Sequence, residues 1–154
     1  MSSIDKITEC FPFPHLPKIL GEPCYASISE MHDKLNANAA SIHTNLGCGT
    51  LGHLWLTLKP EVYATLSVVP FVPPENPGAA PDIPPQSTAA QIASIRYDFD
   101  SLHQIFNKYN NVEQALKTQV IEAEEEIYIQ SLRNKYVSYA NVTTKELLNH
   151  LYNS

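Results

Sequence analysis

The side chains most able to bind a metal ion or act as a nucleophile are three cysteines and six histidines. Cys24, His32, Cys48 and His53 are ligand types that zinc accepts, but the pairs lack the short spacings of zinc fingers or knuckles. A Cys–His nucleophile would pair Cys48 with His53 or His103, although no motif around Cys48 indicates an activated thiolate. We therefore expect no metal site and no catalytic residue, with a small Cys/His enzyme as an alternative.

A glycine pattern at residues 47–52, Gly-Cys-Gly-Thr-Leu-Gly, has the G-x-G-x-x-G spacing of dinucleotide-binding loops. Such a loop cradles a pyrophosphate only where it joins a strand to a helix. Here a helical pattern precedes the glycines, and the acidic residue at the right separation, Glu75, stands among prolines. We interpret residues 47–52 as a flexible turn and expect no cofactor and no small-molecule substrate.

The bulk composition is that of a folded, moderately acidic protein. Of 154 residues, 44% are hydrophobic and 17% charged, which suffices to bury a core in one domain or two small helical lobes. The net charge of −6 and the scattered lysines and arginines disfavour direct binding of nucleic acid, which needs a basic surface. No apolar run approaches about 18 residues, and no signal peptide is evident. We expect a cytoplasmic protein without membrane contact.

An extended arm is predicted at residues 1–24, ahead of the helices that would position any functional residue. Four prolines interrupt this segment, and proline both lacks a backbone N–H and disfavours helix in the residue before it. The arm also carries Phe11, Phe13 and Leu16. These side chains are expected to lie along a hydrophobic groove, either of this chain or of a neighbour.

A helical hairpin region is predicted at residues 25–69. Apolar residues recur at three- and four-residue spacing between 24 and 46, which indicates a first helix. Residues 51–69, which include Trp55, fit two short helices, with Pro60 in the first turn of the second. Taken alone, residues 62–72 also fit a buried strand.

A proline-rich linker is predicted at residues 70–87. Proline fills seven of the 16 positions from 70 to 85, which favours polyproline II or irregular loop. The spacing P-x-x-P occurs three times, but no arginine or lysine stands close by, as a peptide ligand would require. We therefore interpret this segment as a spacer.

A second helical region is predicted at residues 88–154, and its first helix, residues 89–109, has the strongest periodicity in the sequence. Thr88 and Gln91 form a capping box, in which each side chain satisfies an unpaired N–H of the first turn. An apolar stripe at alternating three- and four-residue spacing follows and predicts a seam of a helical bundle. The stripe consists of Ile92, Ile95, Phe99, Leu102, Phe106 and Tyr109.

The next helix is predicted at residues 112–135, with Asn111 as its cap. Glu113 and Lys117 are spaced as a favourable i,i+4 ion pair on its surface. A last helix begins after the cap Thr143 and still continues where the sequence stops, so we expect it to be truncated.

These elements predict an all-α protein: a helical bundle of about five helices with an extended Pro-rich N-terminal arm and a Pro-rich loop. The ten aromatic and aliphatic residues named above, from Phe11 to Tyr109, are the expected packing or interface residues. The sequence therefore favours a protein that works by packing against other protein chains.

Several short runs, in this order, resemble the N-terminal part of Gag-like (capsid) proteins of copia-type long-terminal-repeat retrotransposons. The most specific are Tyr-Ala-Asn-Val-Thr-Thr at 139–144 and Leu-Leu-Asn-His-Leu-Tyr at 147–152. The resemblance covers about residues 12–154. Its other runs are 35–39 (Leu-Asn-Ala-Asn-Ala), 52–58 (Gly-His-Leu-Trp-Leu-Thr-Leu), 62–66 (Val-Tyr-Ala-Thr-Leu), 76–78 (Asn-Pro-Gly), 109–111 (Tyr-Asn-Asn) and 115–117 (Ala-Leu-Lys).

This resemblance implies an all-helical capsid-type domain that self-associates, as a homo-oligomer, into particles around the RNA of the element. The family's zinc knuckle, C-x2-C-x4-H-x4-C, does not occur in this sequence, so contact with element RNA is expected through other segments. A domesticated or truncated Gag fragment that serves as a protein-interaction module is the alternative.

Overall fold

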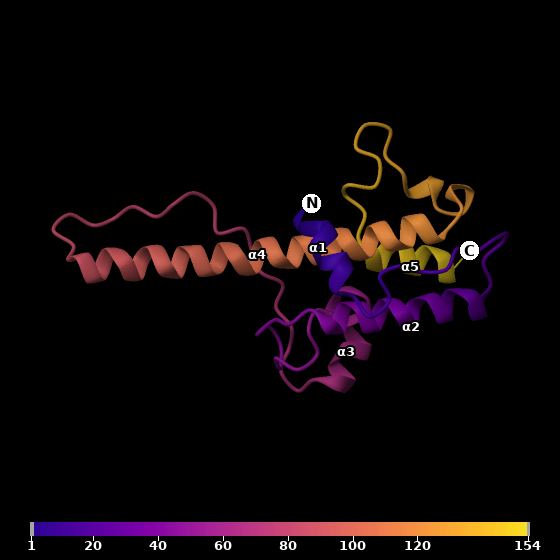
Figure 1. The fold of residues 1–154 in the computed structure, drawn as a ribbon, viewed down its shortest axis with the longest axis horizontal. Helices are drawn as coiled ribbons and strands as arrows, with labels where there is room; N and C mark the ends of the chain where they lie inside the picture. Colours follow the sequence, from indigo (N-terminus) through magenta and orange to yellow (C-terminus); the bar gives the residue numbers. More distant parts are fainter. Residues whose placement is uncertain (1, 154) are drawn as a thin grey trace.

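The long helix α4 (Ala89–Ala123) runs through the whole molecule and determines its shape (Figure 1). The predicted capping box fixes its start, since Gln91 N donates to Thr88 Oγ1 at 3.2 Å and Thr88 N donates to Gln91 Oε1 at 2.8 Å. The C-terminal half of α4 lies among the other helices, whereas the N-terminal half extends away from them (Figure 1). This computed structural model describes residues 2–153.

A single helix replaces the two that the sequence predicted at residues 89–109 and 112–135. Asn110 and Asn111, which were expected to separate them, are interior residues of α4. An asparagine inside a helix costs only about 0.7 kcal/mol relative to alanine. Burial of the apolar side chains that follow outweighs this cost, so tertiary packing keeps the helix continuous. These buried residues are Val112, Ala115, Leu116 and Val120.

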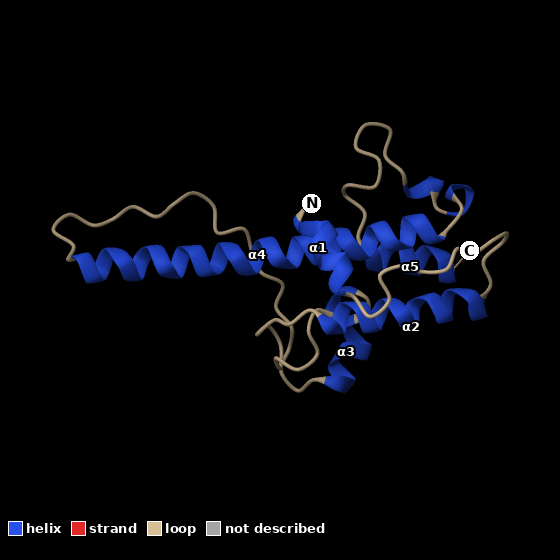
Figure 2. Ribbon diagram, in the orientation of Figure 1, coloured by secondary structure: helices blue, strands red, loops and turns tan. Residues whose placement is uncertain are grey.

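Helices α1 (Ser3–Cys10), α2 (Tyr25–Ser41) and α5 (Thr144–Tyr152) pack around the C-terminal half of α4 (Figure 2). The main hydrophobic core lies between them. Residues 2–153 contain no β-strand, which confirms the predicted all-α fold of about five helices. Side chains with no exposed surface in this core are Leu35, Ala39, Val112, Leu116, Val120, Ile129 and Leu147.

The N-terminal segment begins with a helix, so the prediction of an extended arm over residues 1–24 is wrong at Ser3–Cys10. Ser2 and Asp5 form a capping box there, and the prolines that favour an extended chain begin only at Pro12. Beyond the helix the arm folds back on its own chain. Asn38 in α2 accepts from Phe13 N and donates to Phe13 O, both at 2.9 Å.

Helix α2 ends at Ser41 rather than at residue 46, as the sequence had suggested. The chain turns back onto the helix end, where His53 N donates to Ala39 O at 2.9 Å. Gly52 makes this return possible, because its φ of +54° is left-handed and a Cβ there would collide with the carbonyl of Ala40. A tertiary contact therefore shortens the helix.

A second, smaller hydrophobic cluster follows, built on the 3₁₀ turn η1 (Leu54–Leu56) and helix α3 (Pro60–Leu66). Pro60 occupies the first turn of α3 as predicted, and this helix excludes a strand through residues 62–72. The cluster contains Leu54, Leu58, Tyr63 and Phe71.

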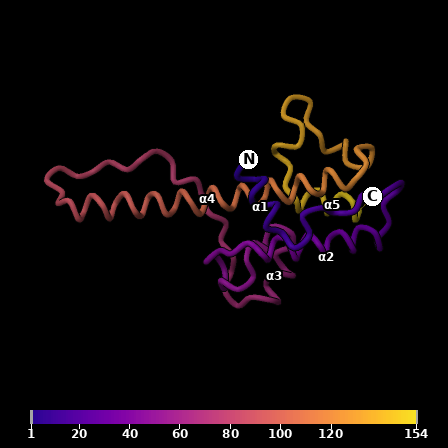
Figure 3. The backbone as a smooth tube through the Cα atoms, in the orientation of Figure 1, coloured from indigo at the N-terminus to yellow at the C-terminus, as the bar shows by residue number. Residues whose placement is uncertain are grey.

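The chain from 67 to 88 contains no helix and leads from this cluster to the far tip of the molecule, where α4 begins (Figure 3). Helix α4 ends at Ala123, whose carbonyl oxygen accepts a hydrogen bond from Ile19 N at 2.7 Å. The predicted helix to residue 135 is therefore wrong, and two 3₁₀ turns replace it, η2 (Glu126–Tyr128) and η3 (Gln130–Leu132).

Candidate functional site

The N-terminal half of α4 is a long helical surface that lies outside the hydrophobic core. None of its residues from 89 to 111 is buried, whereas the C-terminal half of the same helix contributes seven buried residues. Three of its large apolar side chains are exposed to solvent: Tyr97 is 72% exposed, Leu102 57% and Ile105 37%. We call residues 89–108 the projecting segment of α4.

The predicted apolar stripe lies on this segment, and the structure divides it in two. Ile92, Ile95, Phe99 and Phe106 are half-buried and belong to neither hydrophobic cluster, and Leu102 is exposed. Tyr109 instead packs into the body, where its ring lies 6.1 Å from the ring of Phe71 and 6.4 Å from that of His53. Over most of its length the stripe therefore lies outside both clusters and keeps part of its surface accessible to another chain.

The other predicted interface residues serve mainly the fold of their own chain. Phe11 is buried in the main core, and Leu16 packs against it. Trp55 bridges both clusters, with its ring stacked on that of Phe71 at 5.6 Å. Phe13 remains exposed, and Lys34 Nζ lies 5.9 Å from the centre of its ring.

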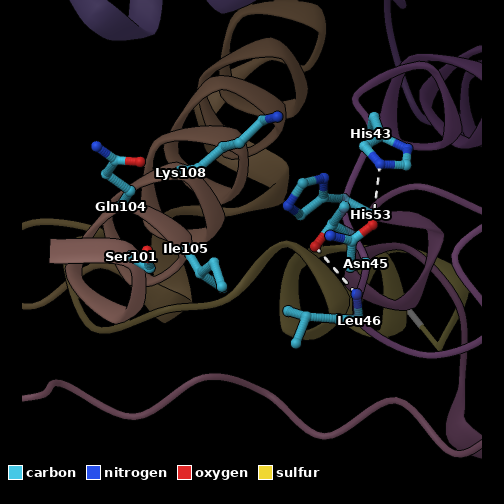
Figure 4. A pocket seen from close by; sticks show the side chains of 9 residues that line it. His43, Asn45, Leu46, His53, Ser101, Gln104, Ile105 and Lys108 are labelled. Carbon is cyan, nitrogen blue, oxygen red and sulfur yellow. Dashed lines mark hydrogen bonds between the residues drawn. The ribbon is translucent and has the colours of Figure 1, made fainter. Parts of the chain in front are cut away.

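A cavity of about 330 Å³ lies where the projecting segment leaves the body (Figure 4). Ser101, Gln104, Ile105 and Lys108 line it from α4, and the loop after α2 lines it from the other side. His53 also faces this cavity, but its Nδ1 lies 2.7 Å from the carbonyl oxygen of Ile42. Burial lowers the pKa of His53, so its imidazole is neutral near pH 7.

The proposed Cys–His pair is not assembled. Cys48 Sγ lies 3.1 Å from Thr50 Oγ1, and this hydrogen bond, followed by one from Ser67, lowers the pKa of the thiol to about 7. Among the described residues no hydrogen bond joins Cys48 to His53 or His103.

The glycine loop and the candidate zinc ligands do not form a binding site in the described chain. Residues 47–52 join α2 to η1, with no strand before them, so they lack the context of a dinucleotide-binding loop. No three His, Cys, Asp or Glu side chains of residues 2–153 are grouped to hold a metal ion. No helix in that range is long and apolar enough to cross a membrane.

Buried polar groups dock α5 onto α4. Glu113 Oε1 accepts from Thr144 N at 2.7 Å and from Thr144 Oγ1 at 2.9 Å. Lys117 Nζ donates to the carbonyls of Tyr139 and Ala140 at 3.0 and 3.3 Å. The predicted surface ion pair between Glu113 and Lys117 is therefore wrong, because each side chain turns inward to satisfy backbone groups of the C-terminal segment.

A second cavity, of about 260 Å³, lies between α2, residues 57–60 and α5. His32 forms one wall, where its Nε2 lies 2.6 Å from Thr57 O and its Nδ1 lies 2.9 Å from Tyr152 Oη. The carbonyl of Thr57 can only accept, so Nε2 is the donor of that hydrogen bond. At the rim, Lys145 Nζ lies 3.5 Å from the centre of the Trp55 ring.

Lys145 has an unusual environment for a lysine. Burial lowers the pKa of its ammonium group to about 8, although Glu113 and Glu61 oppose the shift. No pattern in the sequence predicts this site, because its walls come from three segments that lie far apart in the chain: His32, residues 57–60 and residues 145–152. The available local signal was only the cap Thr143, which places Lys145 in the first turn of α5.

One carboxylate is buried without any partner. Glu124 is 5% exposed, and neither of its carboxylate oxygens has a hydrogen-bond partner. Burial raises the pKa of this carboxyl to about 7, and the neighbouring Glu125 adds to the shift. The negative end of the α4 dipole lies at the same position, since Glu124 is the C-cap of the helix.

Comparisons with protein-family models, with curated proteins and with solved structures find no match to this chain. The fold defines an all-α protein, a class that by itself supports many unrelated functions.

Proposed function

We propose that this chain is a structural, self-associating domain of the Gag or capsid type, which forms protein–protein assemblies around the RNA of a retrotransposon. The projecting segment of α4 carries this proposal. A helix of 20 residues is about 30 Å long. Its exposed apolar side chains gain stability only when another surface covers them.

The stripe on the projecting segment suits pairing with a second copy of itself. Ile95, Phe99, Leu102 and Phe106 are separated by four, three and four residues, a spacing that reads the same in both directions. Two such helices packed antiparallel would therefore set Phe99 against Leu102 and Ile95 against Phe106 of the other chain. Full burial of an exposed large side chain contributes about 1.5–3 kcal/mol. Leu102 has the most to gain, because the other three side chains are already half-buried.

The net charge of −6 does not favour a direct grip on RNA by this domain. We propose that RNA contact resides in other segments of the assembling protein. The role of this domain would then be to hold neighbouring chains together.

Sedimentation velocity over a concentration series tests the proposal. We expect the wild-type chain to form larger species as its concentration rises, and Leu102→Asp to shift this transition to at least tenfold higher concentration, because a charge would be buried in the seam. Asn107→Asp is the matched control, since it adds the same charge at an exposed position away from the stripe. A wild-type chain that stays monomeric at roughly millimolar concentration would overturn the proposal.

A further inference from the structure

The cavity between α2, residues 57–60 and α5 is mainly apolar inside and basic at its rim. Its volume of about 260 Å³ exceeds the roughly 150 Å³ of an apolar protein cavity that admits benzene. Leu58, Pro60 and Leu148 contribute apolar lining. Both ring nitrogens of His32 already have hydrogen-bond partners, so this wall does not require a polar ligand. An aliphatic side chain is therefore compatible with the interior.

Two lysines at the rim, Lys59 and Lys145, form no direct ion pair, since the ion pairs of the described chain are Lys34–Glu30 and Arg133–Glu126. Glu113 and Glu61 act on Lys145 only from a longer distance. Glu146 stands at the same rim, where its carboxylate accepts from Thr143 Oγ1 at 3.3 Å, so the lining carries two positive charges and one negative charge. A ligand with an apolar group next to carboxylates would complement this cavity.

The turn η2 presents that combination on the surface of the same chain. Ile127 is 64% exposed and stands directly after Glu125 and Glu126, whose side chains are also exposed. Each carboxylate has one partner in its own chain and remains largely exposed beside it. Glu125 Oε1 accepts from Gly21 N at 2.9 Å, and Glu126 Oε1 lies 3.6 Å from Arg133 Nη1.

A chain does not present η2 to its own cavity. His150 Nε2 lies 3.0 Å from Tyr128 O, so η2 packs near the His150 side of α5. Lys145 and Tyr152, which line the cavity, are about 140° and 160° away from His150 around the helix, at about 100° per residue. The turn and the cavity therefore face different directions.

We infer that η2 of one chain docks in the α2–α5 cavity of a second copy, with Ile127 inside and Glu125 and Glu126 near Lys59 and Lys145. The two surfaces differ, so the contact is head-to-tail and can continue into a ring or an open chain. This inference rests on the proposed self-association, but it uses a surface separate from the projecting segment of α4. A second copy of the chain is the partner we infer, because its acidic turn with an exposed isoleucine complements an apolar cavity that has lysines at its rim.

The test uses full-length chains that carry Leu102→Asp, so that pairing through α4 is weakened. We expect these chains to associate still at high concentration, with a change in fluorescence of the sole tryptophan, Trp55, because Lys145 lies on its ring. Adding Ile127→Asp should weaken this association at least tenfold. Adding Tyr136→Asp should leave it unchanged, since Tyr136 is 86% exposed and lies outside η2.

A mixing experiment distinguishes a head-to-tail contact from a symmetric one. In the Leu102→Asp background, Asn149→Phe is designed to fill the mouth of the cavity, and circular dichroism checks that it folds. Lys59→Glu is a second cavity variant, at an exposed position, in case the bulky ring perturbs α5. Equal amounts of the Ile127→Asp chain and a cavity variant should form a 1:1 heterodimer, since together they retain one intact turn and one intact cavity.

The outcomes separate this inference from the proposed function. If the mixture stays monomeric, or if Ile127→Asp associates like its parent, the head-to-tail contact is wrong even when the wild-type chain assembles. A Leu102→Asp chain that is strictly monomeric also overturns the contact and leaves assembly through α4 intact. A monomeric wild-type chain overturns both.

Discussion

The buried carboxylate of Glu124 makes a specific prediction about stability and pH. Its two oxygens are shielded from solvent without a hydrogen bond, at the C-terminal end of α4 where the helix dipole also disfavours negative charge. The substitution Glu124→Gln keeps the shape of the side chain and removes its charge at every pH. It therefore isolates the free energy of burying this charge.

The magnitude follows from the raised pKa of Glu124. The folded state raises this pKa from 4.5 to about 7, so the folded protein binds the proton more tightly than the unfolded chain. The stabilisation from protonation is fully present below about pH 4.5 and is lost as the pH rises through about 7. At about 1.36 kcal/mol per pKa unit, the loss amounts to roughly 3 kcal/mol.

Urea unfolding, followed by circular dichroism at pH 5 and pH 8, measures this effect. We expect Glu124→Gln to exceed the wild type in free energy of unfolding by about 1–3 kcal/mol at pH 8, and to lose most of that advantage at pH 5. Glu122→Gln is the matched control, because Glu122 is exposed on the same part of α4. A Glu124→Gln chain that gains no stability over the wild type between pH 5 and pH 8 would refute the reasoning.

Two further predictions concern the carboxylate of Glu113 and the thiol of Cys48. Replacing Glu113 by alanine should lower the free energy of unfolding by about 1–3 kcal/mol, because the N–H and hydroxyl of the fully buried Thr144 lose their acceptor. Glu113→Gln should retain most of the wild-type stability, since an amide oxygen also accepts hydrogen bonds. Equal free energies of unfolding in urea for the wild type and the alanine variant would contradict this role of Glu113. Alkylation of Cys48 by iodoacetamide should reach half its maximal rate near pH 7, and Thr50→Val should shift that midpoint upward. An unchanged pH profile in Thr50→Val would show that the hydrogen bond does not set the reactivity of the thiol.

Local chemistry in the sequence was sufficient for the start of several helices. A threonine followed three residues later by Gln or Glu satisfies N–H groups within one turn, so Thr88 and Thr143 marked their helices correctly. Pro60 likewise marked the first turn of α3, because its ring presets the helical φ. The proline-rich stretch from 70 to 85 could not be helical for the same local reason.

The sequence also supplied the apolar stripe of α4, but not the surroundings of that stripe. Periodicity shows which side chains share a face and does not show what covers the face. The same spacing therefore occurs in the C-terminal half of α4, where Leu116 and Val120 are buried in the core, and in the projecting segment, where Leu102 is exposed.

Tertiary structure alone decided the features that depend on contacts between distant segments. It kept α4 continuous through Asn111, ended α2 where His53 returns to Ala39, and turned Glu113 toward Thr144. In each case a small local preference is overcome, because the folded chain buries apolar side chains or forms a hydrogen bond that the local sequence cannot provide. The α2–α5 cavity and the exposed turn η2 arise in the same way, so the sequence determined that this protein has surfaces for packing, and the fold determined where they are.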